Sequence, residues 1–416
     1  MSTVAEWMEG YMPTRTRVAV GGDESAPRTR PKNRKAQIAA VAAEAFSERG
    51  YHAVGIDDIA SAVGVSGPAL YRHFPNKYAL FVHAVESLSQ ALLDATDAAR
   101  CERDDPRQQL QAVMVAVIGV TLENRRRGGL YRWEGRYLEK TDRENLRLEV
   151  LALRQRIADP LSTVRPELDR AHLGLVTSAV LSVIGSVTAH RSALPPKQIE
   201  AFLLSICWSV IDIELPQIGS STATKGVKVT KQIPGLVRTS KREVLLHEAV
   251  LLFYERGYHE VSIEEIGAAA GITASSVYRY FPSKADLLAA AFHRASDRLN
   301  VTLGSALAES ETPLQAVRTL AEMYVAVFFA QSELLAVYFA EIGNLPDDAR
   351  AELRKIQRLN IEEWAHLCVE ARPELTVVQA RFLVHAALGL VFDVGRVVGF
   401  SEAERVSALL CATLLG

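Results

Sequence analysis

Cysteine is scarce in this chain, and its spacing excludes a cysteine-built metal site. Four cysteines, Cys101, Cys207, Cys368 and Cys411, are spread over 416 residues without a CxxC pair. Structural zinc sites and disulfide frameworks need cysteines that are more closely grouped. We therefore predict reduced, mostly buried thiols, no bound metal and no cofactor.

Catalytic motifs are absent too. The sequence has no HExxH, no GxSxG and no glycine loop of the kind that cradles phosphate. His52 and His259 recur at equivalent places, but neither lies near a carboxylate cluster or a serine or cysteine partner in the sequence. We predict that the protein is not an enzyme.

Long apolar runs and strong charge are also missing. No 18-residue apolar stretch without charges stands out, and no signal peptide is apparent. The composition is ordinary, with 49% hydrophobic residues and a net charge of −2. We expect a soluble cytoplasmic protein without a membrane partner, long enough for two domains of about 200 residues each.

The most informative feature that is present is an internal repeat. Residues 46–77 and 253–284 align without a gap and are identical at 16 of 32 positions. Because a domain's length of other sequence separates the two copies, they indicate duplicated domains and not a solenoid.

Each copy predicts a helix–turn–helix. Apolar residues recur at helical spacing over 34–49 and again over 241–256, and each run stops at a glycine. A short second helix follows, and then Gly64 or Gly271 supplies a tight turn.

The third helix of each copy is the predicted reading helix. Ser66 and Thr273 are suited to cap it, and it is expected to run to about His73 in the first copy and Tyr280 in the second. Such a rod is about 10 Å long, which fits a DNA major groove about 12 Å wide.

The residues that flank this helix suggest phosphate contacts. Lys77 and Lys284 are the first residues of the next helix. A cation at a helix N-terminus is electrostatically unfavourable, so its presence in both copies suggests that it binds an external anion such as a DNA phosphate. In the alternative interpretation, Lys77 and Lys284 are solvated surface charges that bind no phosphate. For Tyr71 and Tyr278 the alternative is that they are core aromatic residues. The full set of predicted DNA contacts is Arg34, Lys35, Ser66, Gly67, Ala69, Tyr71, Arg72, Lys77, Lys241, Arg242, Thr273, Ala274, Ser276, Tyr278, Arg279 and Lys284.

A basic segment precedes each head. Residues 26–36 and the stretch from Lys225 to Arg242 carry several lysines and arginines with no acidic residue among them. Such arms can follow the DNA backbone or enter the minor groove. A merely solvating tail is the alternative.

The repeated stretch, with its endings LYRHFPNK and VYRYFPSK, resembles the DNA-binding domain of TetR-type regulators. The resemblance implies an all-α protein with two helix–turn–helix heads, each followed by a helical regulatory and dimerisation bundle. The family's usual threonine in the reading helix is replaced by Ala69, which can still contact a thymine methyl group.

The helical pattern after each head gives the expected domains. We predict an arm at 1–30, a first domain at 31–214 with its head at 34–80 and regulatory part at 81–214, and a linker at 215–239. The second domain follows at 240–416, with its head at 240–287 and regulatory part at 288–416. The last two helices of each domain are apolar and rich in small residues, and the resemblance implies that they form a four-helix interface. Ordinary core packing is the alternative.

One segment mixes charges with aromatic residues and is the candidate effector site. Tyr131, Trp133, Glu134 and Arg136 lie on one expected helix at 129–139. The segment resembles actinobacterial TetR-type regulators of lipid and sterol catabolism, some of which sense acyl-CoA thioesters. The duplicated chain is most similar to tandem TetR repressors of mycobacterial mammalian-cell-entry operons. A structural Glu–Arg pairing is the alternative.

Together these features predict a transcriptional regulator that binds a double-stranded operator. We expect a repressor released by a lipid-like or acyl-CoA effector and controlling lipid or sterol genes. In the alternative, one copy is only an internal dimerisation partner and there is no effector. The linker, about 25–30 Å on average, allows the two copies to pair within one chain as a pseudo-dimeric monomer.

Overall fold

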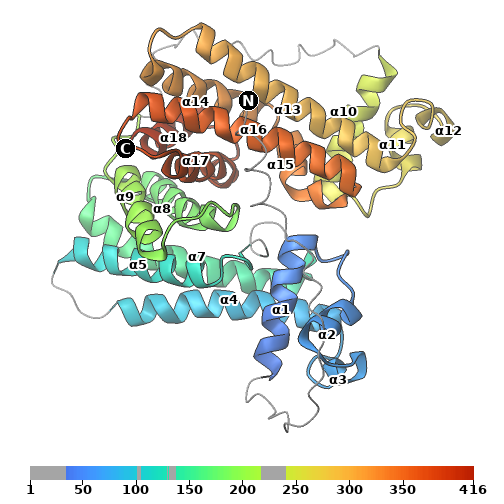
Figure 1. The fold of residues 1–416 in the computed structure, drawn as a ribbon, viewed down its shortest axis with the longest axis horizontal. Helices are drawn as coiled ribbons and strands as arrows, with labels where there is room; N and C mark the ends of the chain where they lie inside the picture. The colour runs from blue at the N-terminus through green and yellow to red at the C-terminus, as the bar shows by residue number, and fades with distance from the viewer. Residues whose placement is uncertain (1–33, 101–104, 129, 131–136, 217–239) are drawn as a thin grey trace, which may run out of the picture.

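The computed structural model describes residues 34–100, 105–128, 130, 137–216 and 240–416. Within these ranges the secondary structure is entirely helical, as the sequence predicts. The two halves of the chain lie one above the other in Figure 1, and both helix–turn–helix heads lie at the same end of the molecule.

The first half begins with the predicted helix at 34–49 and continues through the head into the regulatory part. Its helices are α1 (Arg34–Arg49), α2 (Ile56–Val63), α3 (Gly67–Tyr71), α4 (Lys77–Ala99), α5 (Pro106–Glu123), α7 (Lys140–Val164), α8 (Arg170–Gly185), η2 (Ser186–Thr188) and α9 (Pro196–Ile211). Most of the helix expected at 129–139 lies outside the described residues.

The second half repeats this order. Its helices are α10 (Lys241–Arg256), α11 (Ile263–Ala269), α12 (Ala274–Val277), α13 (Lys284–Ala308), α14 (Pro313–Ala330), α15 (Ser332–Glu341), η3 (Ile342–Asn344), α16 (Asp347–Ala371), α17 (Val377–Val397) and α18 (Ala403–Leu415).

Local capping explains where the head helices begin. Asn76 Oδ1 accepts from the Ala79 N–H at 2.7 Å, and Ser283 Oγ accepts from the Asp286 N–H at 3.1 Å. Before α11, Ser262 and Glu265 form a capping box. The first copy forms half of this motif, because Gly55 donates its N–H to a carboxylate but has no side chain with which to accept in return.

The two halves meet through the small-residue helices of both. α17 packs along α8, and α18 packs against α9. These helices bury Ala179 and Ser182 from the first half and Ala386 and Ala387 from the second. Small side chains let helix backbones approach closely, so the four helices form one continuous core between the halves.

Polar and aromatic contacts also cross this core. Ser182 Oγ of α8 donates to Asp393 Oδ2 of α17 at 2.6 Å. The rings of His190 and His385 stack with centroids 4.2 Å apart, and Phe382 meets the His190 ring edge-on at 4.5 Å. Arg125 approaches the same histidine, since its Nη2 atom lies 3.3 Å from Nδ1 of His190.

Both stacked histidines are held neutral. Burial is the main cause that lowers the pKa of His190 to about 2, and the nearby His385, Arg125 and Arg191 lower it further. Burial, with Arg125 and Arg381, lowers the pKa of His385 to about 4. A charged imidazolium is therefore disfavoured on either side of the core.

We expect the free energy of unfolding to fall when the pH drops below the ordinary histidine pKa of about 6.5. Below that pH the unfolded chain binds protons on both rings, whereas the folded protein leaves them neutral down to about 4 for His385. Stability that is fully present above pH ~6.5 is thus lost progressively below it. Between about pH 7.5 and pH 5, the loss should be about 2 kcal/mol for each histidine.

Urea unfolding followed by circular dichroism at the two pH values measures this loss. His385→Phe keeps an aromatic ring in the stack and should remove about half of the pH dependence. His247→Phe, at an exposed position of α10, is the matched control and should leave it unchanged. An unaltered pH dependence in the His385 variant would show that the stack is not its source.

By length and hydropathy alone, α8 and α17 resemble membrane-spanning helices. Residues 170–188 and 377–397 are long and apolar enough to span a membrane, and the bent pair formed by 313–330 and 332–338 meets the same test if taken as one span. The expectation that no uncharged 18-residue stretch exists is wrong, since 171–188 contains no Asp, Glu, Lys or Arg. In the fold, α8 and α17 cover each other's apolar faces, which accounts for their composition.

Candidate nucleic-acid interface

The turn before each reading helix has the predicted geometry, but the helices are shorter than expected. Gly64 and Gly271 are left-handed, with φ of 73° and 67°. α3 ends at Tyr71 and α12 at Val277, two or three residues before the predicted ends. The residues that follow form turns, because the chain must reach the next helix cap within a few residues.

Ser66 and Thr273 occupy the N-cap positions as predicted, but neither side chain makes a capping hydrogen bond. Thr273 Oγ1 instead lies 3.0 Å from the hydroxyl oxygens of Ser275 and Ser276. Both N-cap side chains are exposed on the reading face. Their hydroxyls are therefore accessible to an external acceptor or donor.

The tyrosines at the C-terminal ends of the reading helices, Tyr71 as the last residue of α3 and Tyr278 as the C-cap of α12, are not core residues. Tyr71 and Tyr278 are each 51% exposed, whereas Leu70 and Val277 beside them are fully buried. The alternative that these tyrosines are core aromatics is excluded. Their equal exposure in both copies leaves two matched hydroxyl groups on the surface of the heads.

The arginines that follow these tyrosines are exposed as well. Within the part of the chain that the structure describes, no hydrogen bond or ion pair engages the guanidinium of Arg72 or Arg279. Two accessible guanidinium groups therefore lie beside the two reading helices, where they are free to bind phosphate or a base edge.

A side chain at position 67 would displace the exposed carboxylate of Asp57. A Cβ atom on Gly67 would lie 2.8 Å from Asp57 Oδ1 at the start of α2. In the second copy Ala274 is partly buried against the core. Ala69 and Ser276 are also partly buried, so the reading face presents only limited surface at these four positions.

The two predicted phosphate-binding lysines have internal partners. Lys284 Nζ donates to the carbonyls of Tyr258 at 2.8 Å and Val261 at 2.7 Å, and it lies 4.3 Å from the Tyr258 ring centre. Lys77 Nζ lies 4.4 Å from the Tyr51 ring centre and 3.5 Å from a backbone carbonyl. Partial burial lowers the pKa of both lysines.

These contacts give each lysine a structural role, because they connect the turn after the first helix of the head to the first residue of its fourth helix. An ammonium group has three donors, and Lys284 uses two of them on carbonyls. The third can still bind a phosphate.

The first helical residue of each head also donates a hydrogen bond to a backbone carbonyl of the same head. Arg34 donates to the Val63 carbonyl at 3.4 Å, and Lys241 donates to the Ala270 carbonyl, also at 3.4 Å. These carbonyls lie at equivalent places near the ends of the second helices.

The next cation of each head lies over an aromatic ring. Lys35 lies 5.4 Å from the ring centre of Phe74, and Arg242 lies 5.0 Å from that of Phe281. The basic arms that precede them lie outside the described residues. The four cations at the start of the heads thus have internal contacts that also explain their recurrence.

The candidate effector residues Tyr131, Trp133, Glu134 and Arg136 lie outside the described residues. The equivalent of the glutamate in the second copy is Glu341, which is buried and structural. Its carboxylate accepts from the Tyr258 N–H at 3.1 Å and from Asn344 Nδ2 at 2.6 Å.

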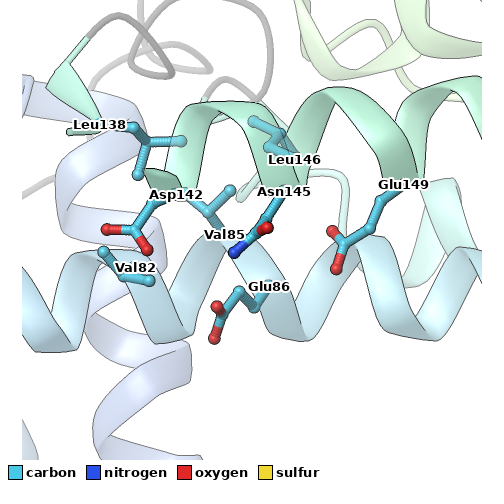
Figure 2. A pocket seen from close by; sticks show the side chains of 8 residues that line it. All are labelled: Val82, Val85, Glu86, Leu138, Asp142, Asn145, Leu146 and Glu149. Carbon is cyan, nitrogen blue, oxygen red and sulfur yellow. The ribbon is translucent and has the colours of Figure 1, made fainter. Parts of the chain in front are cut away.

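A small pocket lies between α4 and α7 of the first half (Figure 2). Its cavity volume is only about 10 Å³, and it is lined by Val82, Val85, Glu86, Leu138, Asp142, Asn145, Leu146 and Glu149. Burial, then the neighbouring Glu149 and Asp142, raises the pKa of Glu86. The pocket is small for an organic ligand, and its three carboxylates disfavour the phosphates of an acyl-CoA.

Two segments of the chain match one family model. Residues 38–84 and 245–291 each match the domain described as bacterial regulatory proteins, tetR family. Both matches cover the helix–turn–helix and the start of the fourth helix of a head.

Curated relatives match in part of their length. Over 96 residues the chain is 36% identical to the HTH-type transcriptional activator FasR of Mycolicibacterium smegmatis, which covers 23% of this chain and 44% of that protein. Over 132 residues it is 29% identical to the HTH-type transcriptional repressor DhaR of a Mycobacterium species, covering 31% and 64%. The chain thus spans less than two thirds of either relative.

Solved structures also match part of the chain. The ketosteroid transcriptional regulator KstR2 of Mycobacterium tuberculosis is 22% identical with a TM-score of 0.39, covering 43% of this chain and 94% of that one.

Proposed function

Because the chain belongs to the TetR family of bacterial regulatory proteins and carries that family's N-terminal domain twice, we propose that it is a cytoplasmic transcriptional regulator that binds operator DNA through both heads. The observation that carries the proposal is the matched pair of exposed arginines, Arg72 and Arg279, beside the two reading helices. Both heads also expose a matched tyrosine hydroxyl next to this arginine, since Tyr71 and Tyr278 are each 51% exposed, which supports a working reading face in both copies.

We propose further that the two halves form a pseudo-dimer within one chain. The packing of α8 and α9 against α17 and α18 supports this arrangement. The two heads differ on their reading faces, since Gly67 and Ala69 stand where the second copy has Ala274 and Ser276. A single chain should therefore read two unequal half-sites.

Selection from a random pool of DNA duplexes tests the proposal. The purified chain is expected to enrich an imperfect palindrome whose half-sites lie about 34–36 Å apart or a multiple of this. Replacing Ser276 with alanine should change the preferred bases in one half-site only. Failure to enrich any sequence would contradict DNA recognition, and two identical half-sites under one chain would contradict the unequal heads.

The effector and the target genes rest on the sequence resemblance alone. We propose a lipid-like or acyl-CoA effector that releases the protein from its operator, with genes of lipid or sterol uptake or catabolism as targets. Such an effector must bind the DNA-free conformation more tightly than the DNA-bound one. Titration of the protein–operator complex with acyl-CoA thioesters tests this, and Arg136→Ala should reduce the response while sparing DNA binding.

A further inference from the structure

The two heads contact each other through the same residue of each copy. His52 lies in the turn after α1, and His259 lies in the equivalent turn after α10. Their imidazole rings meet with centroids 4.6 Å apart and an interplanar angle of 42°. The pseudo-symmetry of the duplicated chain thus places one histidine of each head at the junction between them.

On the first side, His52 is held by its own half of the chain. The ring of Tyr137 meets the His52 ring edge-on at 4.6 Å and stacks against Tyr51 at 5.8 Å. The adjacent Leu138 is buried in the core of the first head. The histidine therefore lies in an aromatic cluster that joins the head to the segment directly before α7 of the regulatory part.

On the second side, hydrogen bonds hold His259. Its Nε2 atom lies 2.7 Å from Asn344 Oδ1, and the amide of this asparagine donates to the buried carboxylate of Glu341 at 2.6 Å. The carboxylate in turn accepts from the backbone of Tyr258. A closed ring of contacts thus orients His259 toward the other head.

From this arrangement we infer that the His52–His259 contact is a spacing determinant for DNA recognition; the inference rests on the proposed function. Each histidine is fixed to its own head, and the two heads carry the two reading helices. A contact between them limits how far the reading helices can move apart or rotate relative to one another. The contact therefore sets which separation of two half-sites the chain accepts.

The test uses the full chain and duplexes in which the two selected half-sites are moved apart in steps of one base pair. Each step changes the separation by about 3.4 Å and also rotates one half-site about the DNA axis. Wild type should bind one spacing best. In the His52→Ala/His259→Ala double variant, the ratio of its affinity for the best spacing to that for neighbouring spacings should fall about two- to tenfold, the range expected for loss of an aromatic pair.

Binding to a duplex with one half-site separates this role from a role in a single head. The double variant should bind such a duplex as wild type does, and thermal unfolding followed by circular dichroism checks that it stays folded without the contacts to Tyr137 and Asn344. The His52→Phe/His259→Phe variant keeps a ring pair and should restore spacing selectivity. His247→Ala, on the exposed face of α10, is the matched control.

A spacing preference that is the same in wild type and the alanine double variant would overturn the inference, as would loss of selectivity in the phenylalanine variant. Wild-type protein that binds no duplex specifically would instead contradict the proposed function.

Discussion

Replacing both Arg72 and Arg279 with alanine is expected to lower operator affinity by about 100-fold or more, toward the level of non-specific binding. Each guanidinium is exposed beside a reading helix. One good arginine contact to a base or phosphate is worth about 1–3 kcal/mol, and the contributions of two distant heads should add. Each single variant should therefore lose about five- to 150-fold.

Fluorescence anisotropy with labelled operator at several salt concentrations measures the loss. An arginine that binds phosphate should flatten the salt slope by about one unit when removed, whereas one that reads a base should relax sequence preference. Arg170→Ala, an exposed position at the start of α8, is the control. If Arg279→Ala left affinity and salt slope unchanged, the second head would not be a working DNA reader.

Experiments on Lys77 and Lys284 need an additional measurement of stability. Lys77→Ala and Lys284→Ala should also weaken binding to all sequences, but the second variant loses its hydrogen bonds to Tyr258 and Val261 as well. Its DNA affinity is therefore interpretable only beside its free energy of unfolding. The arginines, which have no such bonds to described residues, give the cleaner result.

The purified chain is expected to have the mass of one polypeptide, 45.6 kDa, in light scattering at micromolar concentration. The apolar helices that the resemblance assigns to dimerisation are covered within the chain, α8 by α17 and α9 by α18. A flexible tether gives the second half an effective concentration in the millimolar range, far above that of another chain. A mass of twice 45.6 kDa would contradict the pseudo-dimeric monomer.

Ala179→Arg tests the interface itself. Ala179 is fully buried, one helical turn before the serine that bonds to Asp393. A cation there has no partner provided for it, so the free energy of unfolding should fall by several kcal/mol. Urea unfolding measures the change, and Ala201→Arg on the exposed face of α9 should be nearly neutral. Equal stability of the two variants would show that α8 is not part of the essential core.

Local patterns in the sequence determined much of this fold. The period of the apolar residues predicted helices such as α1 and α10 with the bounds that the structure shows. The two left-handed turns followed from glycines, since no other residue adopts that conformation so readily. The repeat itself predicted two heads, because an ungapped match of this length implies the same local structure twice.

Tertiary structure alone decided what the predicted side chains touch. Lys284 was a phosphate candidate by its place at a helix start, but the turn that folds over it provides two carbonyls at hydrogen-bond distance. The contact between His52 and His259 joins positions 207 residues apart and depends on how the two halves pack. Local sequence specifies helix periods and caps through neighbours within a few residues, whereas such contacts arise only when distant helices bury their apolar faces together.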